Sequence, residues 1–279
     1  MSESGSLVVR DQRVTTAAGS LQVRRWSSGS TPGDALPIVL LHESLGCITH
    51  WRQFPEQLAR ATGHAVVAYD RLGFGQSDAQ GGRLERDFVT AEAQGGFAAV
   101  VDQLGIERFV PLGHSVGGGM ALSIAAAAPT RCAGVVSMSA QTFVEDRTLA
   151  GIRAARTLFA DPVQRERLAR HHGGKVDWVL DAWIETWLQP AFAGWNLDDA
   201  LPRIGCPVLA IHGEHDEYGS TRHPERIAAA AAGPVTMKLL PGCGHSPHRE
   251  QPQHVFEAIT AFMSTLAPAH RPTGAAGDR

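Results

Sequence analysis

The sequence predicts an α/β protein with a mostly parallel sheet, flanking helices and a helical insertion late in the chain. Short runs of β-branched and apolar residues alternate with longer, alanine-rich stretches of helical length. This alternation is typical of a parallel sheet whose strands are connected by helices that cover both of its faces. The chain has 279 residues, enough for one domain with a large core, so a second core domain is not required.

The expected elements follow from these runs. An antiparallel strand is predicted early in the chain, at Leu21–Trp26. The main strands are predicted at Ile38–His42, Ala65–Tyr69, Phe109–Leu112, Ala133–Ser139, Val208–His212 and Thr236–Leu240. The helices between them are predicted at Trp51–Thr62, Glu85–Leu104, Ser115–Ala128, Pro224–Ala232 and Gln253–Leu266.

A long segment without a clear strand interrupts this alternation, and four of the six tryptophans lie in it. Trp183 and Trp187 are one helical turn apart and predict an apolar stripe on a helix. The stripe either docks the segment on the sheet or covers an active site, with some aromatic rings facing the substrate. The expected division is a core of residues 1–140 and 204–268, a helical cap at 141–203 and a flexible tail at 269–279.

The composition narrows the classes of function. The net charge is −3 and the isoelectric point is near 6.5, and no cluster of Lys and Arg indicates a nucleic-acid or membrane partner. A secretory signal and a membrane span are not evident. The four cysteines are far apart and show no C-x-x-C spacing, which argues against disulfides and structural zinc. We expect a cytoplasmic protein that binds a small molecule without a metal or cofactor, and we leave self-association open.

The strongest local motif surrounds Ser115. Gly113-His114-Ser115-Val116-Gly117 matches G-x-S-x-G and directly follows a predicted strand. A nucleophile on a sharp turn between strand and helix needs small neighbours, because the backbone is strained and the helix passes close to the strand. Since a serine hydroxyl is a weak nucleophile at neutral pH, it requires a base and a group that orients the base.

Both partners are present further along the chain. Asp216 follows the strand predicted at Val208–His212, and His245 follows the strand predicted at Thr236–Leu240. Because the carboxyl ends of parallel strands lie at one edge of a sheet, we expect Ser115, Asp216 and His245 to meet there.

These motifs resemble the α/β-hydrolase fold superfamily over residues 21–266. Two further family features precede the serine, His42-Glu43-Ser44-Leu45-Gly46 and Asp70-Arg71-Leu72-Gly73-Phe74-Gly75-Gln76-Ser77. The resemblance implies an eight-stranded type of sheet, with Ser115 as nucleophile, Asp216 as acid and His245 as base. It also implies that residues 141–203 form the cap. The oxyanion hole would use the backbone N–H of Val116 and an N–H of the early loop, which we assign to Ser44.

Glu43 departs from the family pattern, in which glycine often follows the histidine of this loop. A carboxylate beside an oxyanion would raise the barrier unless it were protonated, turned away or paired. We expect Glu43 to be turned away or paired, although it could also shift the oxyanion donor or reach the substrate. The candidate substrate contacts are Glu43, Leu45, Trp183 and Trp187.

Other residues offer alternatives. His248 lies three residues after His245 and is a rival base, and Glu145 is an alternative acid because some relatives place the acid after that strand. His212 and His215 with Asp216 have the chemistry of metal ligands, but residues spaced this way along a strand end do not converge on one ion.

The function expected from these residues is hydrolysis of a small to medium carboxylic ester, lactone or thioester through an acyl-enzyme on Ser115. The same triad would also suit a C–C bond hydrolase or a perhydrolase. A different class of function, a small-molecule receptor on a hydrolase fold, also remains open.

Overall fold

The computed structural model describes residues 7–28 and 36–266, so the tail predicted at 269–279 lies outside the described residues. One sheet contains eight strands in the order β1-β2-β4-β3-β5-β6-β7-β8. The strands are β1 (Leu7–Thr16), β2 (Gly19–Ser28), β3 (Ile38–Leu41), β4 (Val66–Tyr69), β5 (Val110–His114), β6 (Val135–Met138), β7 (Val208–Gly213) and β8 (Val235–Leu240). The pairs β1–β2 and β2–β4 are antiparallel and all other neighbours are parallel, which confirms the predicted fold class.

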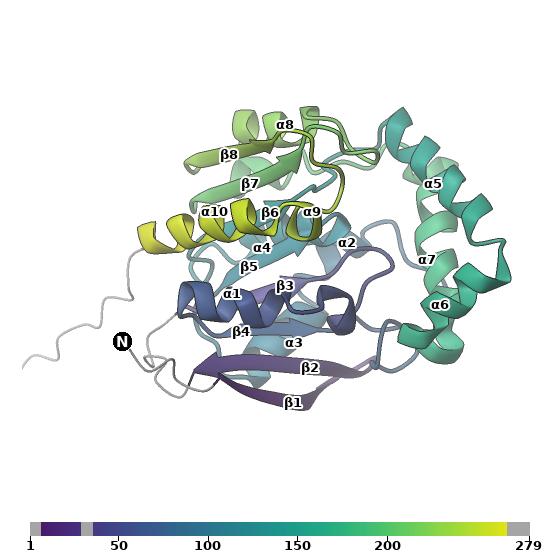
Figure 1. Cartoon of the computed structure of the whole chain (residues 1–279), viewed down its shortest axis with the longest axis horizontal. Helices are drawn as coiled ribbons and strands as arrows, with labels where there is room; N and C mark the ends of the chain where they lie inside the picture. The colour runs from purple at the N-terminus through teal and green to yellow at the C-terminus, as the bar shows by residue number, and fades with distance from the viewer. Residues whose placement is uncertain (1–6, 29–35, 267–279) are drawn as a thin grey trace, which may run out of the picture.

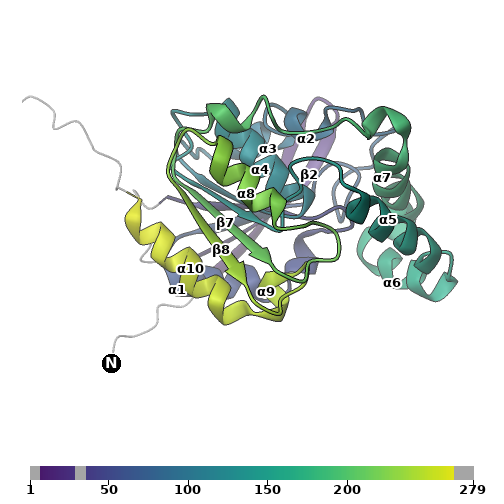
Figure 2. The same cartoon turned by 90° about the horizontal axis from the view of Figure 1, so that it is seen from above.

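Helices cover both faces of this sheet (Figures 1 and 2). The helices are α1 (Phe54–Thr62), α2 (Phe88–Ala91), α3 (Gly96–Gln103), α4 (Val116–Ala127), α5 (Asp146–Leu158), α6 (Pro162–His172), α7 (Val176–Leu188), α8 (Arg222–Ala230), α9 (Pro247–Glu250) and α10 (Pro252–Thr265). Helices α1 and α10 lie on one face, and α3, α4 and α8 lie on the other (Figure 2).

The central strands are buried on both sides, which explains why they read as continuous apolar runs instead of alternating ones. Every residue of β3 to β7 is buried. In β3, Val39 and Leu41 pack in the hydrophobic cluster that contains α4, whereas Ile38 and Leu40 pack in the cluster that contains α1 and α10. The sheet therefore separates two hydrophobic cores.

Strand β1 was not predicted. Val14 is the one buried residue among its ten, and the others are exposed or half-buried. A strand at the edge of a sheet, paired on one side only, does not need an apolar face, so it carries no alternating pattern in the sequence.

Two predicted helices differ from the structure by more than two residues at an end. The helix predicted at Glu85–Leu104 is divided into α2 and α3, with Gly95 and Gly96 at the division. The helix predicted to begin at Trp51 begins at Phe54, because Trp51 ends a separate 3-10 turn at Ile48–Trp51.

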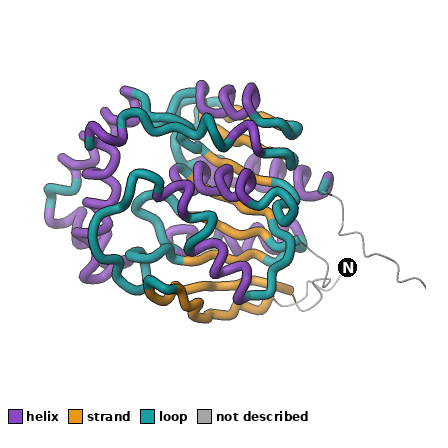
Figure 3. The backbone as a smooth tube through the Cα atoms, turned by 180° about the vertical axis from the view of Figure 1, so that it is seen from behind, coloured by secondary structure: helices purple, strands orange, loops and turns teal. Residues whose placement is uncertain are grey.

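Helices α5, α6 and α7 stand together beside one edge of the sheet, and loops that leave the strands lie between them and the sheet (Figures 1 and 3). Hydrogen bonds attach the start and the middle of this helical segment to the core. In α5, Thr148 Oγ1 donates to Tyr218 O at 2.6 Å. Near the start of α7, Lys175 Nζ donates to Gly75 O at 2.8 Å. These three helices, α5 to α7, are called the cap below.

Within the described parts of the chain, no helix combines the length and apolarity that crossing a bilayer requires.

The first turn of α4 lies unusually close to the neighbouring strand β3. A Cβ atom at Gly117 would overlap the carbonyl oxygens of Leu41 and His42. Since these are backbone atoms of a buried strand, they cannot move aside as a flexible side chain could. The position therefore requires glycine.

We predict that Gly117→Ala lowers the free energy of unfolding by about 1–3 kcal/mol, the typical cost of an extra methyl group in a close-packed interior. Urea unfolding followed by circular dichroism measures this change. Gly81→Ala is the matched control, because nothing lies within 4 Å of a Cβ atom at that position. Equal stability of the two variants would contradict the proposed close contact.

Candidate active site

Ser115 occupies the turn between β5 and α4. Its backbone has φ 56° and ψ −125°, a conformation that non-glycine residues rarely adopt and that is often found at functional sites. Its N–H donates to Met138 O at 2.9 Å, which ties the turn to the end of β6. The serine side chain is held at the carboxyl edge of the sheet, as a G-x-S-x-G turn would place it.

His245 and Asp216 come together in the structure. His245 Nδ1 lies 2.8 Å from Asp216 Oδ2 and 2.9 Å from Oδ1. With the proton on Nδ1, the imidazole donates to the carboxylate and keeps a lone pair on Nε2. Glu250 supports the histidine loop, since its carboxylate accepts from Gly244 N at 2.7 Å and from Ser246 N at 2.9 Å. The sequence did not indicate this role for Glu250.

Asp216 is fully buried and several donors compensate its charge. Besides His245, the N–H groups of Tyr218 and Gly219 donate to its Oδ1 at 2.8 and 3.0 Å. Burial alone would raise the pKa of Asp216, but the hydrogen bond and the charge interaction with His245 outweigh burial and lower it to about 2. The carboxylate is therefore ionised at neutral pH.

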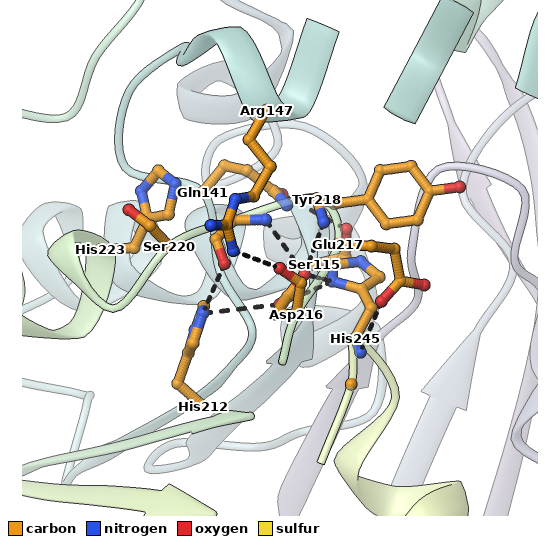
Figure 4. A network of polar contacts seen from close by, with 12 residues as sticks. Ser115, Gln141, Arg147, His212, Asp216, Glu217, Tyr218, Ser220, His223 and His245 are labelled. Atoms are coloured by element: carbon orange, nitrogen blue, oxygen red, sulfur yellow. Dashed lines mark hydrogen bonds and ion pairs between the residues drawn. The ribbon is translucent and has the colours of Figure 1, made fainter. Parts of the chain in front are cut away.

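The hydroxyl of Ser115 has a partner that the sequence did not suggest. Ser115 Oγ donates to Gln141 Oε1 at 3.3 Å. Gln141 is buried and lies in the loop after β6. Figure 4 shows Ser115, Gln141 and His245 near Asp216. Among the described residues this bond to Gln141, and not one to His245, is the hydrogen bond of the serine side chain. Hydrogen bonds at active sites without substrate are often long and tighten when substrate binds.

Ser115 and His245 line the same pocket, which has a volume of about 260 Å³. The pocket is bounded on the cap side by apolar groups from α5, α6 and α7, and on the sheet side by polar residues. The cap side chains are Ile152, Phe159, Leu168, Trp183 and Trp187. The other lining residues include Glu43, Ser44, Leu45, His50, Gln141 and Arg249. All four predicted substrate contacts are thus in the lining.

The two expected oxyanion donors belong to α4 and to the loop after β3. Val116 is the first residue of α4, so its N–H has no acceptor within the helix. Ser44 lies in the loop after β3 and lines the pocket. The helix N-terminus adds a partial positive charge at this end.

Glu43 is paired with basic groups. Its Oε1 lies 3.4 Å from His50 Nδ1 and 3.7 Å from Arg249 Nη2, and its Oε2 lies 3.9 Å from His114 Nδ1. Burial raises the pKa of Glu43, but its interactions with His114 and His50 outweigh burial, and the pKa lies well below its ordinary value. The ionised carboxylate therefore stands next to compensating groups at the edge of the pocket.

Both alternative catalytic groups have other partners in the structure and do not line the pocket. His248 is buried against the rings of Trp51 and Phe54 and is not among the residues that line the pocket. The carboxylate of Glu145 accepts from Ser220 N at 2.5 Å and lies 3.1 Å from His223 Nε2. Glu145 therefore holds a neighbouring loop, while Asp216 contacts His245.

The residues that resemble metal ligands around Asp216 do not converge. His212 Nε2 lies 3.5 Å from Asp216 Oδ2, but it is also 3.0 Å from Gly219 O. His215 is exposed. Asp216 is therefore better explained as the partner of His245 than as a metal ligand.

Comparison with known proteins agrees with the fold. Residues 38–259 match the model of the alpha/beta hydrolase family. The chain is 27% identical to a non-heme chloroperoxidase from Streptomyces lividans, over 90% of this chain and 99% of the relative. It is 25% identical to an uncharacterized protein from Mycobacterium tuberculosis, over 85% of this chain and 78% of the relative.

Among solved structures, the 2-hydroxy-6-oxo-6-phenylhexa-2,4-dienoate hydrolase from Rhodococcus sp. strain RHA1 superposes with a TM-score of 0.75. The two sequences are 18% identical, and the match covers 93% of this chain and 100% of that chain. At this identity the likeness shows a shared fold.

We predict that the Asp216 carboxylate makes stability depend on pH. Because its pKa falls from about 3.8 in the unfolded chain to about 2 in the folded protein, its stabilising effect is complete above pH 4 and is lost as the pH falls toward 2. Between pH 6 and pH 3, wild type should lose about 1 kcal/mol of unfolding free energy relative to Asp216→Asn. Urea unfolding of both proteins at each pH measures the difference, and a difference that stays constant with pH would contradict the assignment.

Proposed function

The chain belongs to the alpha/beta hydrolase family, and from this premise we propose that it is a serine hydrolase. Its substrate would be a small to medium carboxylic ester, lactone or thioester, cleaved through an acyl-enzyme on Ser115. One observation carries the proposal: a buried carboxylate orients His245 at 2.8 Å in the same pocket as Ser115. A serine on a strained turn, a histidine and an acid together suit nucleophilic acyl transfer.

In the proposed mechanism His245 acts as the general base. Its Nε2 accepts the proton of Ser115 while Oγ attacks the carbonyl carbon of the substrate. Asp216 stabilises the imidazolium that forms, because it remains ionised beside Nδ1. His245 then gives its proton to the leaving group, and in the second half of the reaction it activates the water that releases the acid.

The negative charge of the tetrahedral intermediate would be stabilised by backbone N–H groups. The N–H of Val116 at the start of α4 and the N–H of Ser44 are the proposed donors. Glu43 does not oppose this charge strongly in our proposal, because its contacts with His50 and Arg249 compensate it. The amide of Gln141 would release Ser115 Oγ as the serine turns toward His245.

The cap supports the choice of substrate class. Its side chains give the pocket an apolar wall, so a substrate with an apolar portion on one side of the scissile bond would fit it. The volume of about 260 Å³ corresponds to a small or medium molecule. No bound cofactor takes part in the proposed reaction, because the serine and histidine supply the nucleophile and the base.

A second candidate uses the same triad for perhydrolysis. The similarity to a protein named as a non-heme chloroperoxidase favours it over C–C bond cleavage. Here hydrogen peroxide, in place of water, would attack the acyl-enzyme and release a peracid. Hydrogen-peroxide-dependent bromination in the presence of a short carboxylic acid would detect the peracid and distinguish perhydrolysis from simple hydrolysis.

We predict that Ser115→Ala and His245→Ala each lower kcat for p-nitrophenyl esters by about 10⁴-fold or more, because each removes one part of the nucleophilic unit. Wild type should also be labelled stoichiometrically by a phosphonate directed at activated serines, and Ser115→Ala should not be labelled. Steady-state kinetics and intact-mass spectrometry provide these measurements.

Ser246→Ala is the matched control, since Ser246 lines the same pocket without an assigned role. It should keep its activity and its labelling. If Ser115→Ala remained labelled, the nucleophile would be another residue. If a folded wild type were neither labelled nor active on esters, lactones or thioesters, a receptor function would replace the enzymatic one.

We also predict that the cap controls the preferred acyl length. Trp183→Ala should raise KM about 10-fold for esters with longer acyl chains and change it little for acetyl esters, because it removes apolar contact area from the pocket wall. A panel of p-nitrophenyl esters of graded length measures this dependence. Trp178→Phe is the control on the same helix, as Trp178 donates to Gly82 O and does not line the pocket. An equal effect on all chain lengths would contradict the proposed contact.

A further inference from the structure

A cluster of metal-binding side chains lies beside the pocket, between the loop after β3 and the cap. Cys47 and His50 belong to that loop, and His171 lies in the last turn of α6. One ligand atom from each of the three lies within 4.8 Å of the other two. The sequence offered no sign of this cluster, because the two segments are more than one hundred residues apart.

The contacts around Thr49 show that Cys47 and His171 face one another. Thr49 Oγ1 lies 3.1 Å from Cys47 Sγ and 2.8 Å from His171 Nδ1, although Thr49 and His171 are 122 residues apart. The rings of His50 and His171 are 4.2 Å apart between centroids. Three side chains that can each give a lone pair to a metal thus surround one small volume.

The turn that carries Cys47 and His50 is held in place by a hydrogen bond to a buried residue of the core. Asp70 Oδ1 accepts from Ile48 N at 2.6 Å, and Asp70 itself is buried. The neighbouring His172 is not available as a further ligand, since its Nδ1 accepts from Gly75 N at 2.9 Å and its Nε2 is 3.0 Å from Leu45 O. His172 instead anchors the end of α6 beside the cluster.

A histidine that binds a metal through one ring nitrogen usually donates a hydrogen bond from the other ring nitrogen. Glu43 lies where it can accept such a bond from His50. Its Oε1 lies 3.4 Å from His50 Nδ1. A carboxylate at one ring nitrogen holds the proton there and leaves a lone pair on the other nitrogen. Glu43 therefore favours the tautomer of His50 in which Nε2 can bind a metal.

We propose that Cys47, His50 and His171 bind one Zn²⁺ ion that joins the loop after β3 to the cap. One thiolate and two imidazoles form a ligand set that suits zinc, with the fourth tetrahedral position left to water or the hydroxyl of Thr49. Ligand atoms around a tetrahedral zinc lie about 3.3–3.6 Å apart, and those of the cluster lie within 4.8 Å of one another, so each pair has to close by at most about 1.5 Å.

Binding of the ion has a defined proton balance. Cys47 Sγ binds zinc as the thiolate, so the proton of the thiol is released to solvent when the ion binds. The imidazole of His171 coordinates in its neutral form. The ion takes no part in the proposed hydrolysis, and its role is to hold the cap against the loop that carries Ser44.

The site is tested by metal binding alone, on full-length protein without a histidine tag, after removal of metal by chelator. Wild type should bind one Zn²⁺ per chain, measured by elemental analysis after gel filtration. With Co²⁺ as the probe it should show a thiolate-to-cobalt charge-transfer absorption in the near ultraviolet. Saturating Zn²⁺ should raise its melting temperature, because the ion binds the folded state.

Substitutions of the cluster residues test which side chains bind the metal ion. Cys47→Ser should lose the charge-transfer absorption, and His171→Ala should bind Zn²⁺ more than 10-fold more weakly. Glu43→Gln should weaken binding by about 10-fold, as loss of a group behind a metal-binding histidine typically does. Cys206→Ser and His215→Ala are the matched controls outside the cluster and should bind as wild type does.

Absence of stoichiometric Zn²⁺ on folded wild type would overturn the proposal, as would a charge-transfer absorption that survives in Cys47→Ser. His171 is only half-buried, so His171→Ala tests the site even if Cys47→Ser fails to fold. The result is independent of the proposed hydrolase activity, because Ser115→Ala should bind zinc like wild type whether or not Ser115 is a nucleophile.

Discussion

The close approach of α4 to strands β3 and β5 is the constraint on which the candidate site depends. Backbone atoms around Gly113 and Gly117 leave no space for a Cβ atom. Because the helix can start so near the strands, Ser115 lies at the tip of the turn between β5 and α4, and Val116 is the first residue of the helix. The strained backbone of Ser115 is held by the packing of buried elements on every side, which is how folded proteins maintain unfavourable local conformations.

Charge compensation is the second organising feature. Two carboxylates at the candidate site, Asp216 and Glu43, are both largely withdrawn from water, and each has basic partners. Asp216 faces His245 directly, so its charge can stabilise an imidazolium. Glu43 faces His50 and Arg249 at the rim of the pocket. The two carboxylates therefore have different environments, and the environment of Asp216 suits the orientation of a catalytic base.

The cap connects the pocket wall to these charged groups. Its helices supply the apolar side of the pocket, while its hydrogen bonds to the core reach loops on both sides of the site. The proposed zinc site would lie at one of these junctions, where α6 meets the loop after β3. Since His50 also lines the pocket, anything that fixes His50 would affect both the cap and the rim of the pocket.

The sequence by itself determined the sheet, most helices and the loops that carry Ser115, Asp216 and His245. These features depend on local periodicity, on glycines at a turn and on the rule that parallel strands end at one edge. Only the tertiary structure decided the rest. The edge strand β1 has no apolar face to mark it, and Gln141 meets Ser115 because β5 and β6 are neighbours. Cys47, His50 and His171 meet because the cap folds back over the core. Contacts between distant segments depend on how whole elements pack, and no spacing along the chain records them.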